Sequence, residues 1–144
     1  MLLYITKKRL VFKGCHYNYF MAYAGIVLER RGKYLLQLRD DKAPTNPNKW
    51  SLFGGGIEKN ETPINCIIRE IQEELGVLLD KDKLNFLIKI KYSNDDCYIY
   101  RTKFNYSLKD LKLNEGADMK FFSKEEIMKL ENLVKGIREL FLLI

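Results

Sequence analysis

Four charged residues that could act together, Arg69, Glu70, Glu73 and Glu74, fall within six positions of the chain. Side chains three and four positions apart lie one above the other on a helix, so a helix here would gather the three carboxylates on one arc. Their repulsion near the negative end of the helix dipole would cost roughly a few tenths of a kcal/mol per contact. A divalent cation such as Mg²⁺ prefers oxygen ligands of this kind. The spacing alone favours a solvated acidic face, and a cation site is the alternative that needs further signals.

The segment around these residues has clear helix boundaries. Thr62 can cap the first amides, and Pro63 suits the first helical position. Gly76 stands where helices commonly end, which predicts a helix from about Pro63 to Leu75. Its apolar residues fall within an arc of roughly 100° and predict a stripe that packs on a sheet. These are Ile64, Ile67, Ile68, Ile71 and Leu75.

Strands are expected on both sides of this helix. They cover residues 22–30, 33–39, 50–53, 84–92, 97–105 and 118–122. A loop rich in Pro, Asn and Asp occupies 40–49, and the strand at 50–53 leads into the glycines at 54–56. A capping box of Ser123 and Glu126 opens a C-terminal helical region, 123–144, whose apolar residues keep a helical period. Strands without regular βαβ alternation predict a mixed sheet flanked by helices, an α/β sandwich.

Size and charge narrow the classes of protein. A chain of 144 residues and 17.0 kDa suits a single domain over 1–144, with 1–20 as an N-terminal extension or extra strands. The net charge is +6, yet residues 53–80 hold six acidic and two basic side chains. An acidic segment in a basic protein suits a cation site that attracts polyanions such as nucleotides. The charge alone favours the simpler interpretation of a lysine-rich solvated surface.

Membrane, zinc and disulfide chemistry are not expected. No apolar run approaches the roughly 20 residues that span a bilayer, and the N-terminus lacks the continuous apolar stretch of a signal peptide. We therefore expect a cytoplasmic protein. Cys15, Cys66 and Cys97 show no C-x-x-C spacing, and His16 is the only histidine. Cys15 and His16 are interpreted as adjacent by chance and not as a reactive pair.

The stretch GGIEKNETPINCIIREIQEELGV, residues 55–77, resembles the Nudix hydrolase box, G-x5-E-x7-R-E-U-x-E-E-x-G-U with U aliphatic. Every defined position matches. The matching residues are Gly55, Glu61, Arg69, Glu70, Ile71, Glu73, Glu74, Gly76 and Val77. The strand pair before the box and the segment NEGADMKFF after it are also similar to the family. The resemblance implies a Nudix-type α/β/α sandwich whose loop, helix and loop of the box form a metal site.

The resemblance also implies roles for individual residues. Glu73 and Glu74 would be the principal ligands of Mg²⁺, with Mn²⁺ as a substitute, and Glu70 a further ligand or the base. The backbone carbonyl of Gly54 would add an oxygen. Glu61 and Arg69 would pin the glycine loop to the helix. Glu115, in the place of a more distant family glutamate, would bind metal or take the proton of the attacking water, so the base is Glu70 or Glu115.

The implied reaction is Mg²⁺-dependent hydrolysis of a diphosphate linkage in a small nucleotide-like substrate. A nucleoside triphosphate, including an oxidised one, ADP-ribose and a nucleotide sugar remain open. Expected substrate contacts are Arg39, Asp40, Trp50 and Phe53, although an aromatic at a strand end such as Phe53 is more often core. The other hypotheses are a non-catalytic nucleotide- or RNA-binding module and an enzyme that trims RNA 5′ ends. Nucleic acid is not the favoured partner, and the chain is expected to be a monomer or homodimer.

Overall fold

The computed structural model describes residues 4–6, 9–11, 22–92 and 94–144. Within them a seven-stranded sheet has the order β5-β4-β3-β8-β7, with β6 paired to β3 and β9 paired to β4. The strands are β3 (Tyr23–Arg30), β4 (Lys33–Leu38), β5 (Trp50–Ser51), β6 (Phe53–Gly56), β7 (Asn85–Tyr92), β8 (Asp95–Lys103) and β9 (Asp118–Ser123). β3 and β8 are parallel and the other pairs antiparallel, which confirms the predicted mixed sheet.

Two further strands, β1 (Tyr4–Thr6) and β2 (Arg9–Val11), pair with each other and, among the described residues, with no other strand. They fall in the segment predicted to be an N-terminal extension or extra strands. The neighbouring pair Cys15 and His16 lies outside the described residues. No helix in the described part of the chain is long and apolar enough to cross a membrane.

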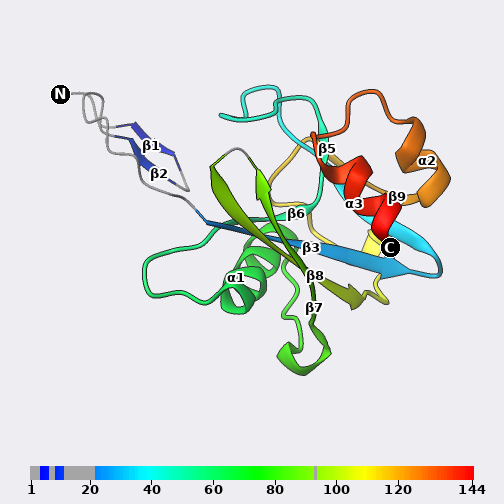
Figure 1. Cartoon of the computed structure of the whole chain (residues 1–144), viewed down its shortest axis with the longest axis horizontal. Coiled ribbons are helices and arrows are strands. Elements are labelled where there is room, and N and C mark those ends of the chain that lie inside the picture. Colours follow the sequence, from blue (N-terminus) through cyan, green and yellow to red (C-terminus); the bar gives the residue numbers. More distant parts are fainter. Residues whose placement is uncertain (1–3, 7–8, 12–21, 93) are drawn as a thin grey trace.

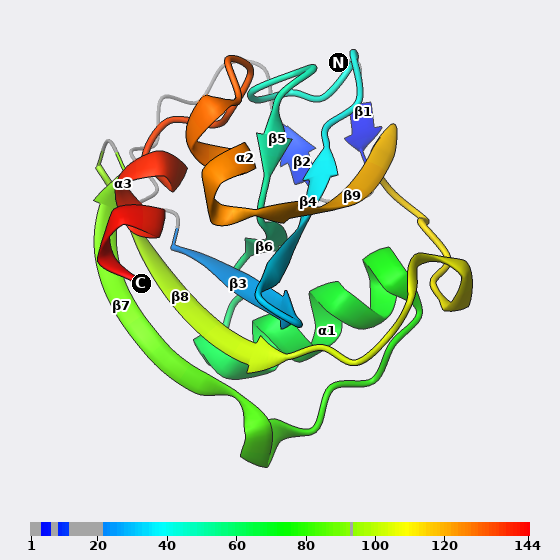
Figure 2. The same cartoon turned by 90° about the vertical axis from the view of Figure 1, so that its right-hand side faces the viewer.

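Helices cover both faces of the sheet, so that the fold has three layers (Figures 1 and 2). Successive side chains of a strand point to opposite faces, and β3 shows the consequence. Ala24, Ile26 and Leu28 pack in one core cluster with α1 (Pro63–Leu75), whereas Val27 packs in a second with α2 (Lys124–Lys129) and α3 (Ile137–Leu143). The central strand thus holds both outer layers in place.

Helix α1 begins and ends as predicted. The Thr62 hydroxyl accepts a hydrogen bond from the Asn65 amide, and Gly76 closes the helix in the left-handed conformation. Its buried face differs from the expected stripe of isoleucines. Ile67, Ile71 and Leu75 are buried, but Ile64 and Ile68 are only partly buried. The remaining buried residues of the helix are Cys66, Glu70 and Glu74. Two of the three clustered glutamates therefore face the interior.

The strand predicted at 50–53 is two strands. β5 pairs with β4 and β6 pairs with β3, and Leu52 separates them. The three glycines, expected in a loop, belong to β6. Their lack of side chains lets this strand lie closely between β3 and α1. The glycine run thus supplies a strand edge to the helix instead of a flexible turn.

The C-terminal region is helical only in part. α2 ends at Lys129, and residues 130–136 are extended or turning before α3 begins at Ile137. The segment between the two helices is hydrogen-bonded to β5. The Trp50 amide donates to the Asn132 carbonyl (2.8 Å), and the Val134 amide donates to the Trp50 carbonyl (2.9 Å). These tertiary hydrogen bonds replace the helical ones that the apolar period predicted.

Candidate active site

The glycine strand β6 forms one wall of the site. Gly54 has a φ of +140°, and a Cβ there would lie 2.1 Å from the carbonyl oxygen of Ala24. At Gly55 a Cβ would lie 2.2 Å from Glu70 Oε1. Only glycine at these two positions leaves room for β3 on one side and for the Glu70 carboxylate on the other. Close approach from both sides therefore favours glycine at positions 54 and 55.

Two carboxylates of α1 are buried against this wall. Glu70 and Glu74 are each 1% exposed and lie one helical turn apart. The Gly54 amide donates a hydrogen bond to Glu74 Oε2 at 3.2 Å. Burial of two like charges is costly unless donors or a cation compensate for the lost water. Two donors compensate for part of this cost, the Gly54 amide at Glu74 and the Arg69 guanidinium at Glu70.

Arg69 ties the start of the box to its helix. Its guanidinium donates to both carboxylate oxygens of Glu61 (2.7 and 2.9 Å) and to the Gly56 carbonyl (3.1 Å). It also donates to Glu70 Oε1 at 2.9 Å, and Glu73 Oε1 lies 3.4 Å away. The hydrogen bonds from Arg69 lower the pKa of Glu61, and those to Glu61 raise the pKa of Arg69. Through these hydrogen bonds Arg69 links α1 to Glu61 and to the glycine strand, as the resemblance implied.

Cys66 lies behind the same wall and shows no sign of reactivity. Its thiol donates weakly to the carbonyls of Gly55 (3.6 Å) and Gly56 (3.5 Å). Burial, with the negative charge of Glu61 as a smaller contribution, raises the pKa of the thiol to about 12. The thiol is therefore neutral at pH 7 and supports the wall as a packing residue.

The loop that carries Glu115 is bonded to the last turn of α1. The Asn114 amide donates to the Glu74 carbonyl (2.9 Å), and its side chain donates to the Glu73 carbonyl (3.1 Å). On the other side of the loop, the Ala117 amide donates to the Leu38 carbonyl (2.8 Å). Asn114 was missed in the sequence, where an Asn before Glu and Gly is an ordinary turn signal.

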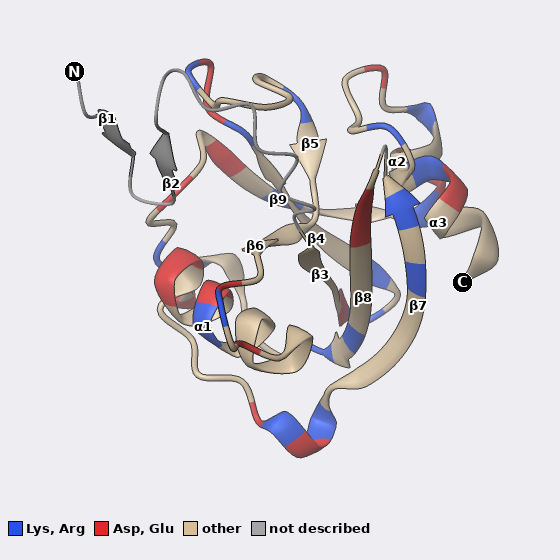
Figure 3. Cartoon of the chain, turned by 60° about the vertical axis from the view of Figure 1, so that its left-hand side comes forward, with Lys and Arg blue, Asp and Glu red and all other residues tan. Residues whose placement is uncertain are grey.

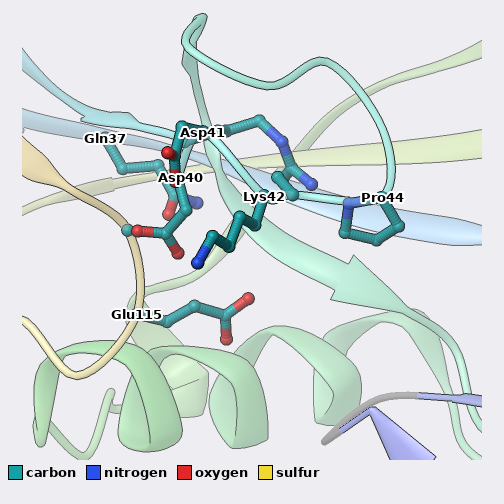
Figure 4. A pocket seen from close by; sticks show the side chains of 9 residues that line it. Gln37, Asp40, Asp41, Lys42, Pro44 and Glu115 are labelled. Atoms are coloured by element: carbon teal, nitrogen blue, oxygen red, sulfur yellow. The ribbon is translucent and has the colours of Figure 1, made fainter. Parts of the chain in front are cut away.

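A pocket of about 420 Å³ opens between this loop and the end of β4 (Figure 4). Its lining residues are Gln37, Arg39, Asp40, Asp41, Lys42, Ala43, Pro44, Glu115 and Gly116. The Arg39 guanidinium donates to the Thr45 carbonyl (2.8 Å) and hydroxyl (3.3 Å), which braces the loop at 40–49. The structure thus brings the predicted contacts Arg39 and Asp40 to the same pocket as Glu115.

Comparison with known proteins decides the family. The NUDIX domain family matches residues 19–144. An uncharacterized Nudix hydrolase of Listeria monocytogenes is 34% identical over 121 residues, covering 81% of this chain and 70% of its own. The chain belongs to the Nudix hydrolase family.

Two other proteins extend the comparison of this Nudix hydrolase. A human diphosphoinositol polyphosphate phosphohydrolase is 31% identical over 102 residues, covering 67% of this chain and 55% of its own. The crystal structure of the MutT protein from Methanosarcina mazei has a TM-score of 0.63 and 27% identity, covering 84% of this chain and 88% of its own. These likenesses confirm the Nudix sandwich and an enzyme that acts on phosphoric anhydrides.

Two of the expected substrate contacts lie away from the pocket in this Nudix hydrolase. Phe53 is fully buried in the core cluster on the α1 face, so we leave it out of the proposed substrate contacts. Trp50 packs edge-on against Phe122, with ring centroids 4.8 Å apart, in the cluster on the opposite face. Its backbone also holds the segment at 130–136. Phe53 is therefore a core residue, whereas a substrate contact of the partly buried Trp50 stays a prediction.

The acidic residues of the box fit a divalent cation by their chemistry. Glu70, Glu73 and Glu74 lie on α1, where Figure 3 shows acidic residues beside the glycine strand. All offer hard oxygen donors of the kind that Mg²⁺ prefers. In the part of the chain that the structure describes, no three His, Cys, Asp or Glu side chains are already gathered as a ligand cluster. Nudix hydrolases generally use divalent metal ions, and the ligand roles of individual residues stay predictions.

Proposed function

We propose that this Nudix hydrolase cleaves the diphosphate linkage of a nucleoside diphosphate-linked small molecule in a Mg²⁺-dependent reaction. One observation carries the proposal. Glu70 and Glu74, each 1% exposed, are buried one turn apart against the glycine strand, and the Glu115 loop is bonded to the same end of the helix. Buried neighbouring carboxylates suit a bound cation, whose charge compensates for their lost hydration.

The residues that would hold Mg²⁺, or Mn²⁺ in its place, are Glu70, Glu73, Glu74 and Glu115, with the Gly54 carbonyl as a further oxygen. The cation lowers the pKa of water and neutralises charge on the phosphates when bound. Arg69 orients Glu70 through the hydrogen bond to Oε1. Asn114 holds the Glu115 loop beside Glu73 and Glu74.

We propose that Glu115, rather than Glu70, is the base that takes the proton of the attacking water. Glu70 Oε1 already accepts a hydrogen bond from Arg69, and the Glu70 side chain is buried against the glycine strand. Glu115 lines the pocket in which a substrate would lie. General base catalysis requires a carboxylate within hydrogen-bond reach of the water that attacks phosphorus, and a residue lining the substrate pocket can meet this requirement.

The experiment compares wild type with Glu73→Gln. Glu73 has a half-exposed side chain, so this substitution leaves the core intact. Both proteins are incubated with Mg²⁺ and nucleoside triphosphates, oxidised nucleotides, ADP-ribose, nucleotide sugars and triphosphorylated RNA, and phosphate-bearing products are separated by chromatography. The matched control is Glu131→Gln, an exposed acid between α2 and α3.

The proposal is supported if wild type and Glu131→Gln cleave a panel member alike while Glu73→Gln loses at least about a hundredfold in rate. Cleavage of RNA alone, with affinity that falls steeply with salt, would favour the enzyme that trims RNA ends. No cleavage by wild type, together with nucleotide binding that persists in EDTA, would replace catalysis by the binding-module hypothesis.

A further inference from the structure

The pocket beside Glu115 has an unusually polar lining. Five of its nine lining residues carry a charge: Arg39, Asp40, Asp41, Lys42 and Glu115. Its apolar lining is limited to Ala43, Pro44 and Gly116. No aromatic ring is among the described residues that line it. Small-molecule pockets are usually dominated by apolar and aromatic side chains, so this lining restricts the kind of group that the pocket can take.

The loop that supplies this lining is held in place at its base. The Arg39 amide donates to the Lys49 carbonyl (3.0 Å), and the Asn48 amide donates to the Arg39 carbonyl (3.2 Å). The Ala43 amide donates to the Asp40 carbonyl (3.1 Å), which turns the chain within the loop. Figure 4 shows the side chains of Asp40 and Lys42 extending from this turn towards the segment of Glu115. The charged groups are thus presented by a braced loop.

The charges of the lining are complementary to a ligand with both donors and acceptors. Ionised carboxylates such as those of Asp40 and Asp41 only accept hydrogen bonds, whereas Lys42 only donates them. A hydroxyl group does both, and several hydroxyls on one ring can satisfy neighbouring acids and amines together. We propose that the pocket takes a neutral ring bearing several hydroxyl groups, so that the substrate is a sugar linked to a nucleoside diphosphate; this rests on the proposed function.

The same lining disfavours two other groups. A nucleobase gains most from stacking on an aromatic side chain, which the described lining lacks. A densely phosphorylated ring would bring many negative charges beside Asp40 and Asp41, whose ionised carboxylates repel them and can only accept hydrogen bonds. A neutral sugar ring needs no aromatic stacking partner and brings no negative charge to the pocket. The pocket therefore selects the sugar and leaves the base without a specific partner there.

The test varies the sugar and the base separately. Hydrolysis with Mg²⁺ is measured for ADP-glucose, UDP-glucose, GDP-glucose, ADP methyl ester, ATP and a diphosphoinositol polyphosphate. We expect kcat/KM for ADP-glucose at least about fiftyfold above that for ADP methyl ester, because a site built for hydroxyl groups rejects an analogue without them. The three glucose compounds should agree within about fivefold, since no stacking ring reads the base.

Variants of the lining residues test whether the preference for the sugar arises in the pocket. Asp40→Asn and Asp41→Asn should each reduce the ratio of kcat/KM between ADP-glucose and ADP methyl ester by about tenfold, the usual effect of losing a hydrogen bond to a charged group. The matched control is Asp82→Asn, an exposed aspartate in the short 3₁₀ helix Lys81–Lys83. It should leave both the ratio and the activity unchanged.

Binding to wild type in EDTA separates the two proposals. Calorimetric binding that prefers ADP-glucose to ADP methyl ester, and loses the preference in Asp40→Asn, supports the pocket assignment even if no panel member is hydrolysed. Metal-dependent hydrolysis with equal rates for the two compounds would overturn the pocket assignment and leave the proposed function standing. A preference for ATP, for one base or for the diphosphoinositol compound would also overturn it.

Discussion

Asn114 bridges two consecutive carbonyls at the end of α1, donating from its amide to Glu74 (2.9 Å) and from its side chain to Glu73 (3.1 Å). The last carbonyls of a helix have no partner within it, so these two donors satisfy groups that would otherwise need water. The bridge joins positions about 40 residues apart in the sequence. It fixes Glu115, the next residue, beside the acidic end of the helix.

Asn114→Ala should therefore impair catalysis more than folding. Loss of the side-chain donor to the exposed Glu73 carbonyl should lower the free energy of unfolding by about 1 kcal/mol. A loop misplaced by about 1 Å can cost on the order of a hundredfold in rate, so kcat should fall with little change in KM. Asn85→Ala, which removes a similar bond to the Lys83 carbonyl far from the site, is the control and should retain kcat. Equal losses in the two variants would contradict a positioning role.

Gly55→Ala should displace the Glu70 carboxylate. The new Cβ would lie 2.2 Å from Oε1, and Arg69 holds that oxygen in place. We expect a loss of about 1 to 2 kcal/mol in stability from overpacking, measured by urea unfolding. Activity should fall by about a hundredfold, since the carboxylate of a proposed metal ligand moves. At Gly32 a Cβ meets no atom within 4 Å, so Gly32→Ala should cost only the strain of its positive φ and keep its activity.

Arg69→Lys tests the pin between glycines and helix. Lysine cannot reproduce the paired hydrogen bonds to Glu61 together with the bond to the Gly56 carbonyl. We expect a loss of about 2 kcal/mol in the free energy of unfolding, because the partly buried Glu61 and the fully buried Glu70 lose donors. Arg138→Lys removes one exposed bond to the Leu130 carbonyl and should change stability by less than about 0.5 kcal/mol. An equally small change in the free energy of unfolding of Arg69→Lys would rule out a role of Arg69 in holding the glycine strand to the helix.

Stability should depend on pH through Glu29. Hydrogen bonds from Lys103 and then Arg101 hold the pKa of this carboxyl below its ordinary value of 4.5. The folded state therefore gains stability from Glu29 above pH 4.5 and loses it as the pH falls through the lower folded pKa. Glu29→Gln should lower stability by about 1 kcal/mol at pH 7. The difference from wild type should shrink in urea unfolding below pH 4, and a constant difference would contradict this linkage.

Mg²⁺ should stabilise the fold directly. A ligand that binds only the folded state adds about 2.7 kcal/mol at roughly 100 times its Kd, which raises Tm by several degrees in a domain of this size. Thermal unfolding with Mg²⁺ and with EDTA should show this shift in wild type and in Glu131→Gln. Glu73→Gln should show a smaller shift. The absence of any Mg²⁺-dependent shift in wild type would contradict a cation site at the box.

Local signals in the sequence determined the elements and the chemistry of the box. The helix at Pro63–Leu75 was predicted because its cap, first residue and final glycine are neighbours in the chain. Apart from the one predicted at 50–53, the predicted strands correspond to observed ones for the same reason, since period-two patterns act over a few residues. The residue types and spacing of the box also gave the family, which the match over residues 19–144 confirms.

The tertiary structure decided which side chains meet. Phe53 is core because β6 lies between β3 and α1, and no pattern within the chain measures that burial. The break of the C-terminal helical region depends on hydrogen bonds to Trp50, more than 80 positions away. Asn114 bonds the carbonyls of Glu73 and Glu74 because the chain returns to the end of α1. Such contacts form only when distant segments pack together, so the free energies that fix them are absent from any short window of sequence.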